Sequence, residues 1–291
     1  MSLAWLQIHF CVLLWGFTAI LGKLITLPAL AIVWWRTLLV SAALVMVGRF
    51  WRAVVRMPRR LIGIYAGIGI VVALHWVTFY GSIKSANASV AATCMALIPI
   101  MIAFVEPFIA KRRFDVRELM FGLAVVPGVA FVVGGTPTEM RLGIAIGALS
   151  ALLAAVFACL NKRFVERADA LAITGIEMAS GAALMTAVVL AMPDFEIAWP
   201  RGNDAVYLLV LALGCTLLPF ALSLVALRKL STFSTALAVN MEPVYAILLA
   251  IVLLGEQREL EPHFYIGVAI ILGVVFGHPW LQRAKPADSA A

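Results

Sequence analysis

Charged side chains are scarce in this sequence. Of its 291 residues, 13% are Asp, Glu, Lys or Arg and 64% are hydrophobic, and the mean hydropathy is +1.05. A soluble domain is about one-quarter charged and about half apolar. A fold of this length cannot hide so much apolar surface from water. The composition therefore excludes a soluble protein and predicts a chain embedded in a lipid bilayer.

Signatures of enzymes and metal sites are also missing. The four cysteines form no CxxC pair and are expected to be small packing residues, and the four histidines lack metal-ligand spacing. No P-loop is present, which argues against an ATP-driven pump. Every aspartate lies in a predicted loop or in the tail, and none forms a DxxD pair. We therefore expect no catalytic residue, no metal and no cofactor.

Ten apolar segments are each long enough to cross a hydrocarbon core, which needs about 20 helical residues. They are expected to be helices, because an open strand in lipid leaves its backbone polar groups unpaired. The sequence thus predicts an all-α integral membrane protein with ten transmembrane helices. We place them near residues 3–23, 29–48, 61–83, 87–110, 115–134, 142–163, 170–191, 204–227, 232–254 and 261–282.

Basic residues predict the orientation, because Lys and Arg favour the cytoplasmic side of a membrane. If the N-terminus is inside, 16 of the 22 basic residues fall in inner loops or the tail, five in outer loops, and Arg36 within a span. The net charge of +7 therefore reflects membrane topology rather than a surface for nucleic acid. Both termini are predicted to be cytoplasmic.

An internal repeat divides the chain. Residues 29–32 recur as residues 170–173, and Pro99 recurs as Pro243 within a matching apolar run. Such repeats are typical of secondary transporters. The sequence predicts two five-helix repeats, over residues 1–140 and 141–291, the second ending in a short cytoplasmic tail.

The two repeats are predicted to be inverted. Five spans per half is an odd number, so the second half must enter the membrane from the opposite side. The loop charges agree with this, since residues 111–117 are basic whereas the equivalent residues 256–261 are mostly acidic.

Two prolines mark a candidate transport site. Pro99 and Pro243 each remove a backbone donor near the middle of a span and free the carbonyl four residues earlier, on Met95 or Val239. Helix breaks at equivalent depths of two repeats point to a transport site. The alternative is a pair of tolerated kinks, since proline is common in membrane helices. We predict that both prolines are flexible points that control access.

Charged residues inside a span are costly and usually functional. Glu242 lies beside Pro243 and is the strongest candidate for contact with a proton or a substrate amine. Arg36 and Glu177 are equivalent in the two repeats and are candidates for coupling transport to an ion. Because the repeats are inverted, these two residues should lie toward opposite faces of the membrane. A direct salt bridge between them would be strained, and the alternative is that the two long side chains meet or share a water.

Polar and aromatic residues near these positions complete the predicted cavity. Tyr80 also fits an interfacial aromatic belt, but His75 at the start of the same stretch does not. Asn240 and Tyr245 flank Glu242. The predicted substrate-binding residues are His75, Trp76, Tyr80, Met95, Asn240, Glu242 and Tyr245.

Several motifs together resemble a known family. They are Trp15-Gly16, Lys23, Arg36, the segment 81–89, Pro99, Asn240-Met241-Glu242-Pro243 and Leu253-Leu254-Gly255-Glu256. They are similar to those of the drug/metabolite transporter superfamily, EamA type, and most like its YddG-type aromatic amino-acid exporters. The resemblance covers essentially the whole chain. It implies a ten-helix basket in the bacterial inner membrane, with a central cavity and alternating access.

The leading hypothesis is a secondary transporter that exports amino acids, including aromatic ones, and related small metabolites. Its partners would be the small-molecule substrate and the bilayer, and it would function as a monomer. A second hypothesis is export of other metabolites or cationic drugs, with Glu242 binding the cation. The third, a membrane-embedded enzyme, is disfavoured because the sequence lacks paired acids, a metal site and a nucleophile–base pair.

Overall fold

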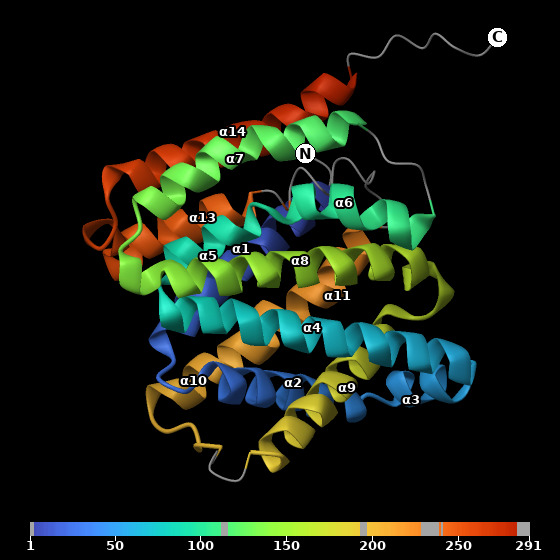
Figure 1. The fold of residues 1–291 in the computed structure, drawn as a ribbon. Coiled ribbons are helices and arrows are strands. Elements are labelled where there is room, and N and C mark those ends of the chain that lie inside the picture. Colours follow the sequence, from blue (N-terminus) through green and yellow to red (C-terminus); the bar gives the residue numbers. More distant parts are fainter. Residues whose placement is uncertain (1–2, 112–115, 193–196, 228–238, 240, 284–291) are drawn as a thin grey trace, which may run out of the picture.

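The computed structural model describes residues 3–111, 116–192, 197–227, 239 and 241–283, and the described chain consists of helices and their connections (Figure 1). The first repeat contributes α1 (Leu3–Leu24), α2 (Ala29–Val45), α3 (Gly48–Val55), α4 (Arg59–Ser85), α5 (Ala88–Met95), α6 (Ile98–Ala110) and α7 (Val116–Gly134). After the short 3-10 turn η1 (Thr138–Met140) come α8 (Arg141–Phe164), η2 (Val165–Arg167), α9 (Ala170–Leu190), α10 (Asn203–Leu209), η3 (Val210–Leu217), α11 (Leu218–Leu227), α13 (Glu242–Leu249), η4 (Ala250–Leu254), η5 (Glu256–Arg258) and α14 (Pro262–Arg283). Segments η3 and η4 are π-helical.

Six helical stretches of the described chain are long and apolar enough to cross a membrane. A seventh is obtained if α2 and α3, which are bent by 88° at residues 46–47, form one span. Three shorter apolar helices cover Ala124–Gly134, Glu242–Leu254 and Pro262–Val274. The all-helical membrane class is thus confirmed, whereas the count of ten crossings stays a prediction.

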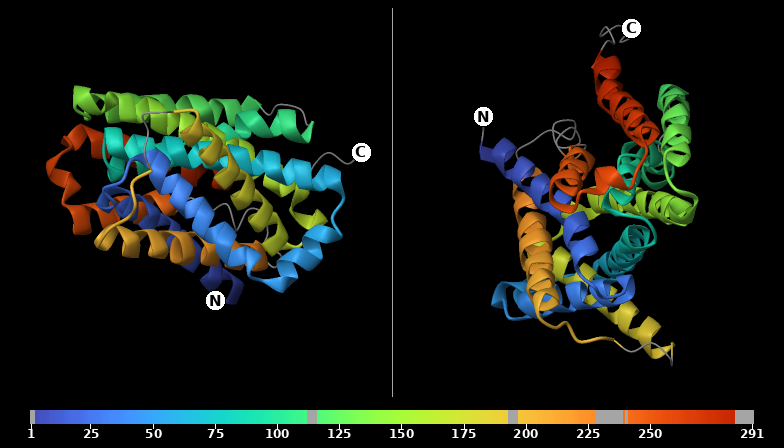
Figure 2. Two further views of the ribbon diagram at one scale, coloured as in Figure 1. Left: turned by 90° about the horizontal axis from the view of Figure 1, so that it is seen from below. Right: turned by 90° about the vertical axis from the view of Figure 1, so that its left-hand side faces the viewer.

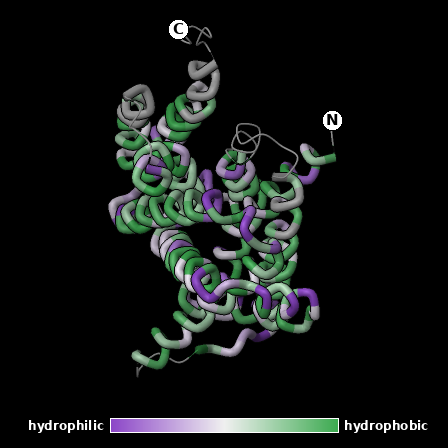
Figure 3. The backbone as a smooth tube through the Cα atoms, turned by 90° about the vertical axis from the view of Figure 1, so that its right-hand side faces the viewer, coloured by the Kyte–Doolittle hydropathy of each residue, from purple (hydrophilic) through white to green (hydrophobic). Residues whose placement is uncertain are grey.

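The outer wall of the bundle is apolar, as expected of a surface in contact with lipid tails. Phe108, Leu190 and Val252 are 74%, 80% and 77% exposed. Buried polar residues such as Arg36 and Glu177 lie inside instead. Hydrophilic residues gather at the end of the bundle that carries α3 and the α8–α9 connection (Figure 3). Apolar side chains face outward and charged ones are buried, which is the reverse of a water-soluble fold and is expected of a protein surrounded by lipid.

Helices of the two repeats interleave rather than form separate bundles. Helix α4 packs against α8 and α9, and α13 packs against α1 and α5. Helix α14 runs beside α7 along one edge of the molecule (Figures 1 and 2). An interior site between the repeats would therefore take residues from both halves of the sequence.

Two glycines allow the close approach of α7 and α14. A Cβ added at Gly128 would lie 3.0 Å from the carbonyl oxygen of Gly267, and one at Gly267 would collide with the backbone of Gly128 and Val132. Small residues permit such backbone contacts in membranes, where packing replaces the hydrophobic effect as the force between helices.

One end of the bundle is joined by polar contacts between the repeats. Asp204, at the start of α10, accepts hydrogen bonds from the backbone N–H and hydroxyl of Thr26 at 2.9 and 2.6 Å. The buried carboxylate of Glu256 accepts the backbone N–H groups of Ala88 and Ser89 at 3.0 and 2.8 Å. These N–H groups begin α5 and lack partners within the helix, so the negative charge is well placed.

Candidate functional site

The fourth span is broken beside its central proline. Helix α5 ends at Met95 and α6 begins at Ile98, so Pro99 occupies the first turn of the new helix, where its missing N–H costs no hydrogen bond. Pro243 holds the same place in α13, which begins at Glu242. The two prolines therefore occupy matching positions at the start of helices from different repeats.

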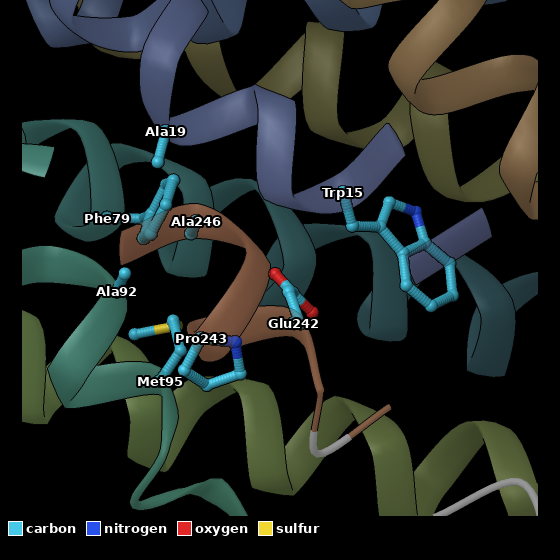
Figure 4. A pocket seen from close by; sticks show the side chains of 8 residues that line it. All are labelled: Trp15, Ala19, Phe79, Ala92, Met95, Glu242, Pro243 and Ala246. Carbon is cyan, nitrogen blue, oxygen red and sulfur yellow. The ribbon is translucent and has the colours of Figure 1, made fainter. Parts of the chain in front are cut away.

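Residues of α5, which ends at this break, and of α13 contribute to a narrow cleft in the interior (Figure 4). The cleft contains about 180 Å³ of space between atoms, and this conformation leaves no room in it for a substrate. Its walls come from α1, α4, α5 and α13. The lining residues are Trp15, Ala19, Phe79, Ala92, Met95, Glu242, Pro243 and Ala246.

Among the described residues that line the cleft, Glu242 alone has a charged side chain. In Figure 4 its carboxylate lies between the indole of Trp15 and the ring of Pro243. The residue is half-buried. Because desolvation penalises an unpaired carboxylate, Glu242 favours a proton or a cationic group as its partner.

Arg36 is the second charged residue of the interior and is only 2% exposed. Its Nη1 donates to the hydroxyl of Tyr80 at 2.8 Å and its Nε donates to the hydroxyl of Thr216 at 2.6 Å. The guanidinium carbon lies 3.6 Å from the ring centroid of Trp76, a cation–π contact. These neighbours hold the guanidinium in place without neutralising its charge.

The charges of Arg36 and Glu242 interact without forming a salt bridge. Each contributes to the electrostatic environment of the other, yet the ion pairs of the described chain do not include them. Arg36 comes from α2 and Glu242 from α13, so the opposite charges belong to different repeats. The interior therefore carries one positive and one negative group that have no direct ionic partner among the described residues.

A row of aromatic side chains leads from Arg36 to the cleft. The ring of Trp76 lies edge-on to Phe220 at 6.4 Å between centroids, and Phe220 lies edge-on to Trp15 at the same distance. Trp15 lines the cleft beside Glu242. The positive and negative groups are thus connected by a wall that offers apolar area and π faces.

The structure brings some of the predicted site residues together and separates others. Met95, Glu242 and Pro243 line the cleft, and Trp76 and Tyr80 contact Arg36. Tyr245 packs its Cβ near Gly16 of α1 instead of lining the cleft. Asn240 lies outside the described residues.

His75 points toward α8 and away from the lining of the cleft. Its Nδ1 lies 3.0 Å from the carbonyl oxygen and 2.9 Å from the hydroxyl oxygen of Ser150, and the same hydroxyl donates to the His75 carbonyl at 2.9 Å. Its ring also lies 5.5 Å from that of Phe157. These contacts hold the His75 ring between α4 and α8.

Four contributors to the interior were not among the residues predicted to bind substrate: Trp15, Phe79, Thr216 and Phe220. Trp15 carried a signal, since it belongs to a motif of the family resemblance. Thr216 carried none, because it is a single hydroxyl in an apolar run. It lies in the π-helical segment η3 and donates to the carbonyl of Leu211, five residues earlier. Such π segments are frequent at functional sites.

The described residues contain no group of three or more His, Cys, Asp or Glu side chains able to hold a metal ion. The chemistry available to the site is therefore that of one carboxylate, one guanidinium, hydroxyls and aromatic rings. This set can bind and orient a solute.

Comparisons with known proteins agree with the architecture. The sequence model of the EamA-like transporter family matches residues 3–134 and again residues 141–277. A solved structure titled "Crystal structure of protein" is similar over 97% of this chain and 99% of that chain, with a TM-score of 0.66 and 19% sequence identity. At that identity the likeness shows the fold alone. No match was found among curated proteins.

Proposed function

Since the chain belongs to the EamA-like transporter family, we propose that it exports small zwitterionic solutes, amino acids foremost, across the bacterial inner membrane. Membership makes the chain a multi-pass membrane transporter of small molecules rather than an enzyme. The proposal adds the class of substrate, the direction of transport and the membrane. Both termini are proposed to lie in the cytoplasm, on the basis of the loop charges.

The placement of Arg36 and Glu242 is the observation that carries this proposal. An α-amino acid has a carboxylate and an ammonium group separated by a single carbon. The guanidinium of Arg36 matches the carboxylate, and the carboxylate of Glu242 matches the ammonium group. Each interaction would neutralise a charge that the interior otherwise leaves without a direct ionic partner.

The aromatic wall supports amino acids with apolar or aromatic side chains. Trp15 and Phe79 line the cleft with Glu242, and Trp76, which contacts Arg36, is linked to Trp15 through Phe220. A pocket with apolar walls and few polar groups accepts a range of side chains while fixing the common backbone. Because one chain supplies all these residues, we propose that a monomer suffices for transport.

Export of cationic drugs is the weaker alternative. Glu242 alone would suit a cation, but the buried guanidinium of Arg36 interacts with the same region and would repel it. A zwitterion satisfies both groups at once. The charges therefore favour a solute with an anionic and a cationic end.

The decisive test is exchange in proteoliposomes loaded with an unlabelled amino acid, measured as uptake of the labelled one. Unlabelled zwitterions should compete, whereas the N-acetylated acid and the decarboxylated amine should each compete at least about tenfold less, because each lacks one charged interaction worth about 1.5–3 kcal/mol. An amine that competes as well as the zwitterion would support the cation reading. Absence of exchange with any amino acid, from protein shown to be folded, would overturn the proposal.

The two prolines are proposed to be flexible points in an alternating-access cycle. The closed cleft must widen to admit a solute. Pro243 lines the cleft at the start of α13, and Pro99 begins α6 directly after α5, whose last residue Met95 also lines it. Alanine at either position has a backbone N–H and no pyrrolidine ring, so the helix can extend back through the break, which should stiffen the span. We expect a slower maximal exchange rate with little change in the half-saturating concentration.

The control variant is P58A, because Pro58 precedes α4 at an exposed position away from the cleft. A rate unchanged in both P99A and P243A would contradict this role.

A further inference from the structure

A second buried acidic site lies between α4, α8 and α9, apart from the cleft. Glu177 is 1% exposed, and it is not among the residues that line the cleft. Gly69 of α4 lies so close to the Glu177 backbone that an added Cβ would collide with it. Close packing of the two helices keeps water away from this carboxyl group, so its charge has no solvent to stabilise it.

The neighbours of Glu177 do not supply an opposite charge. Among the described residues it takes part in no salt bridge. The side chain that interacts with its carboxyl group is Asn161, in the last turn of α8. The hydroxyl of Tyr65 is directed elsewhere, since it donates to the carbonyl of Phe164 at 2.9 Å.

Two oxygen atoms at this site lack hydrogen-bond partners. They are Oε1 of Glu177 and Oδ1 of Asn161, and both are buried. Each is an acceptor, so neither can satisfy the other. Buried polar atoms are rarely left unpaired, and each such atom costs about 1–3 kcal/mol. When Glu177 is ionised, the site therefore lacks a hydrogen-bond donor for these two oxygen atoms.

Protonation of Glu177 would satisfy both oxygen atoms. A carboxylic acid and a primary amide form a reciprocal pair, in which the amide N–H donates to the carboxyl oxygen and the acid O–H donates to the amide oxygen. We propose that Glu177 and Asn161 form a proton-binding site, loaded in this conformation, whose release of the proton couples transport to the pH gradient. On loading, a carboxylate oxygen forms an O–H bond with a proton taken from water. On release, that bond breaks and the proton returns to water.

The surroundings allow Glu177 to respond to protons without interference from another acid. The charged or titratable groups nearest in sequence and packing include Tyr65 on α4, Arg36 on α2, Arg49 and Arg52 on α3, Lys162 and Arg163 on α8, and Glu166 and Arg167 in η2. Lys162, Arg163, Glu166 and Arg167 are exposed, so Glu166 does not share the buried site. Arg36 is engaged at Tyr80 and Thr216, and Arg49 pairs with Asp169 at 2.8 Å. Helix α11 contributes no titratable residue to its contact with α9.

The site lies near the end of the bundle that is predicted to face the cytoplasm. Glu177 follows the start of α9 by two turns, and Asn161 precedes the end of α8 by one. Arg36, its equivalent in the first repeat, lies instead beside the proposed substrate. The inverted repeats thus assign solute binding to one member of the pair and proton binding to the other.

The coupling proposal rests on the proposed function, so its test separates exchange from accumulation. Glu177→Gln retains the shape of the acid, and its amide can donate to Oδ1 of Asn161 as the protonated acid would. We expect E177Q to exchange amino acids as the wild type does. For one proton per substrate, each pH unit should drive an accumulation ratio of about tenfold in the wild type. That ratio should fall to about one in E177Q and remain unchanged in the control E166Q, whose glutamate is exposed in η2.

Infrared difference spectroscopy on the purified protein supplies a readout that does not require transport. The wild type should show a protonated-carboxyl band that titrates with pH, that E177Q removes and E166Q keeps, and that shifts in Asn161→Leu. Absence of this band, or pH-driven accumulation equal in E177Q and wild type, would overturn the proposal. Accumulation driven by sodium in place of protons would also overturn it. If the wild type exchanges no amino acid but shows the band, the proposed substrate fails and the proton site stands.

Discussion

Replacing Arg36 with glutamine is expected to lower the transport of zwitterionic amino acids by about 10- to 100-fold. Charge-assisted hydrogen bonds contribute about 1.5–3 kcal/mol each, and the loss of one corresponds to this range. Glutamine can still bond to Tyr80 or Thr216, so the helix contacts around position 36 should persist. The measurement is the concentration dependence of amino-acid exchange in proteoliposomes, with the amount of folded protein determined for each sample.

Two controls distinguish binding of the substrate carboxylate from a packing role of Arg36. R36K retains the charge but loses the planar fork that reaches Tyr80 and Thr216 together, so it should recover part of the activity. Decarboxylated amines lack the group that Arg36 binds. Their weak transport should therefore not fall in R36Q, and it should rise if the positive charge repels them. An equal loss for zwitterions and amines would assign Arg36 to the stability of the fold.

The overall class could be predicted from the sequence because lipid imposes a simple rule on composition. Long apolar runs with basic loops between them can satisfy their backbone only as membrane helices. The details were less accessible. The span predicted over residues 29–48 ends at Val45, and the chain then turns by 88° into α3. Hydropathy does not detect this bend, because Met46 and Val47 continue the apolar run across it.

The candidate site was only partly predictable, for a physical reason. A proline or a charge inside an apolar span has few structural uses, so Pro99, Pro243, Arg36 and Glu242 stand out in the sequence. An aromatic residue in such a span can face lipid, a neighbouring helix or a cavity. These helices carry apolar residues on every face, so the sequence does not show whether a given ring faces lipid, a neighbouring helix or a cavity. Phe79 therefore escaped notice.

The same ambiguity explains the placement of His75. Its polarity within a span suggested a cavity residue, but the backbone carbonyl and the hydroxyl of Ser150 meet its ring inside a helix–helix contact. A histidine needs only one or two polar partners to be buried, and a serine on a neighbouring helix suffices. Such a partner is separated by 75 residues here and cannot be identified from one sequence.

Replacing Glu242 with glutamine is expected to reduce exchange of zwitterionic amino acids by about 10- to 100-fold, because the substrate ammonium group loses its ionic partner. The size and polarity of the side chain are retained, so the cleft should keep its form. Glu139→Gln, at an exposed position of η1, is the matched control and should exchange normally. The sharpest comparison uses an N-acetylated amino acid, which has no ammonium group.

The weak transport of the N-acetylated amino acid should be insensitive to E242Q, or should improve, because the carboxylate of Glu242 no longer repels an anionic solute. The same compound should remain sensitive to R36Q, while a decarboxylated amine should show the opposite pattern. R36Q should thus impair only the N-acetylated acid, and E242Q only the decarboxylated amine. This pattern is expected only if each side chain binds a different end of the substrate. If E242Q lowers the transport of zwitterion, acid and amine alike, Glu242 acts on the motion of α13, and the recognition of the ammonium group lies elsewhere.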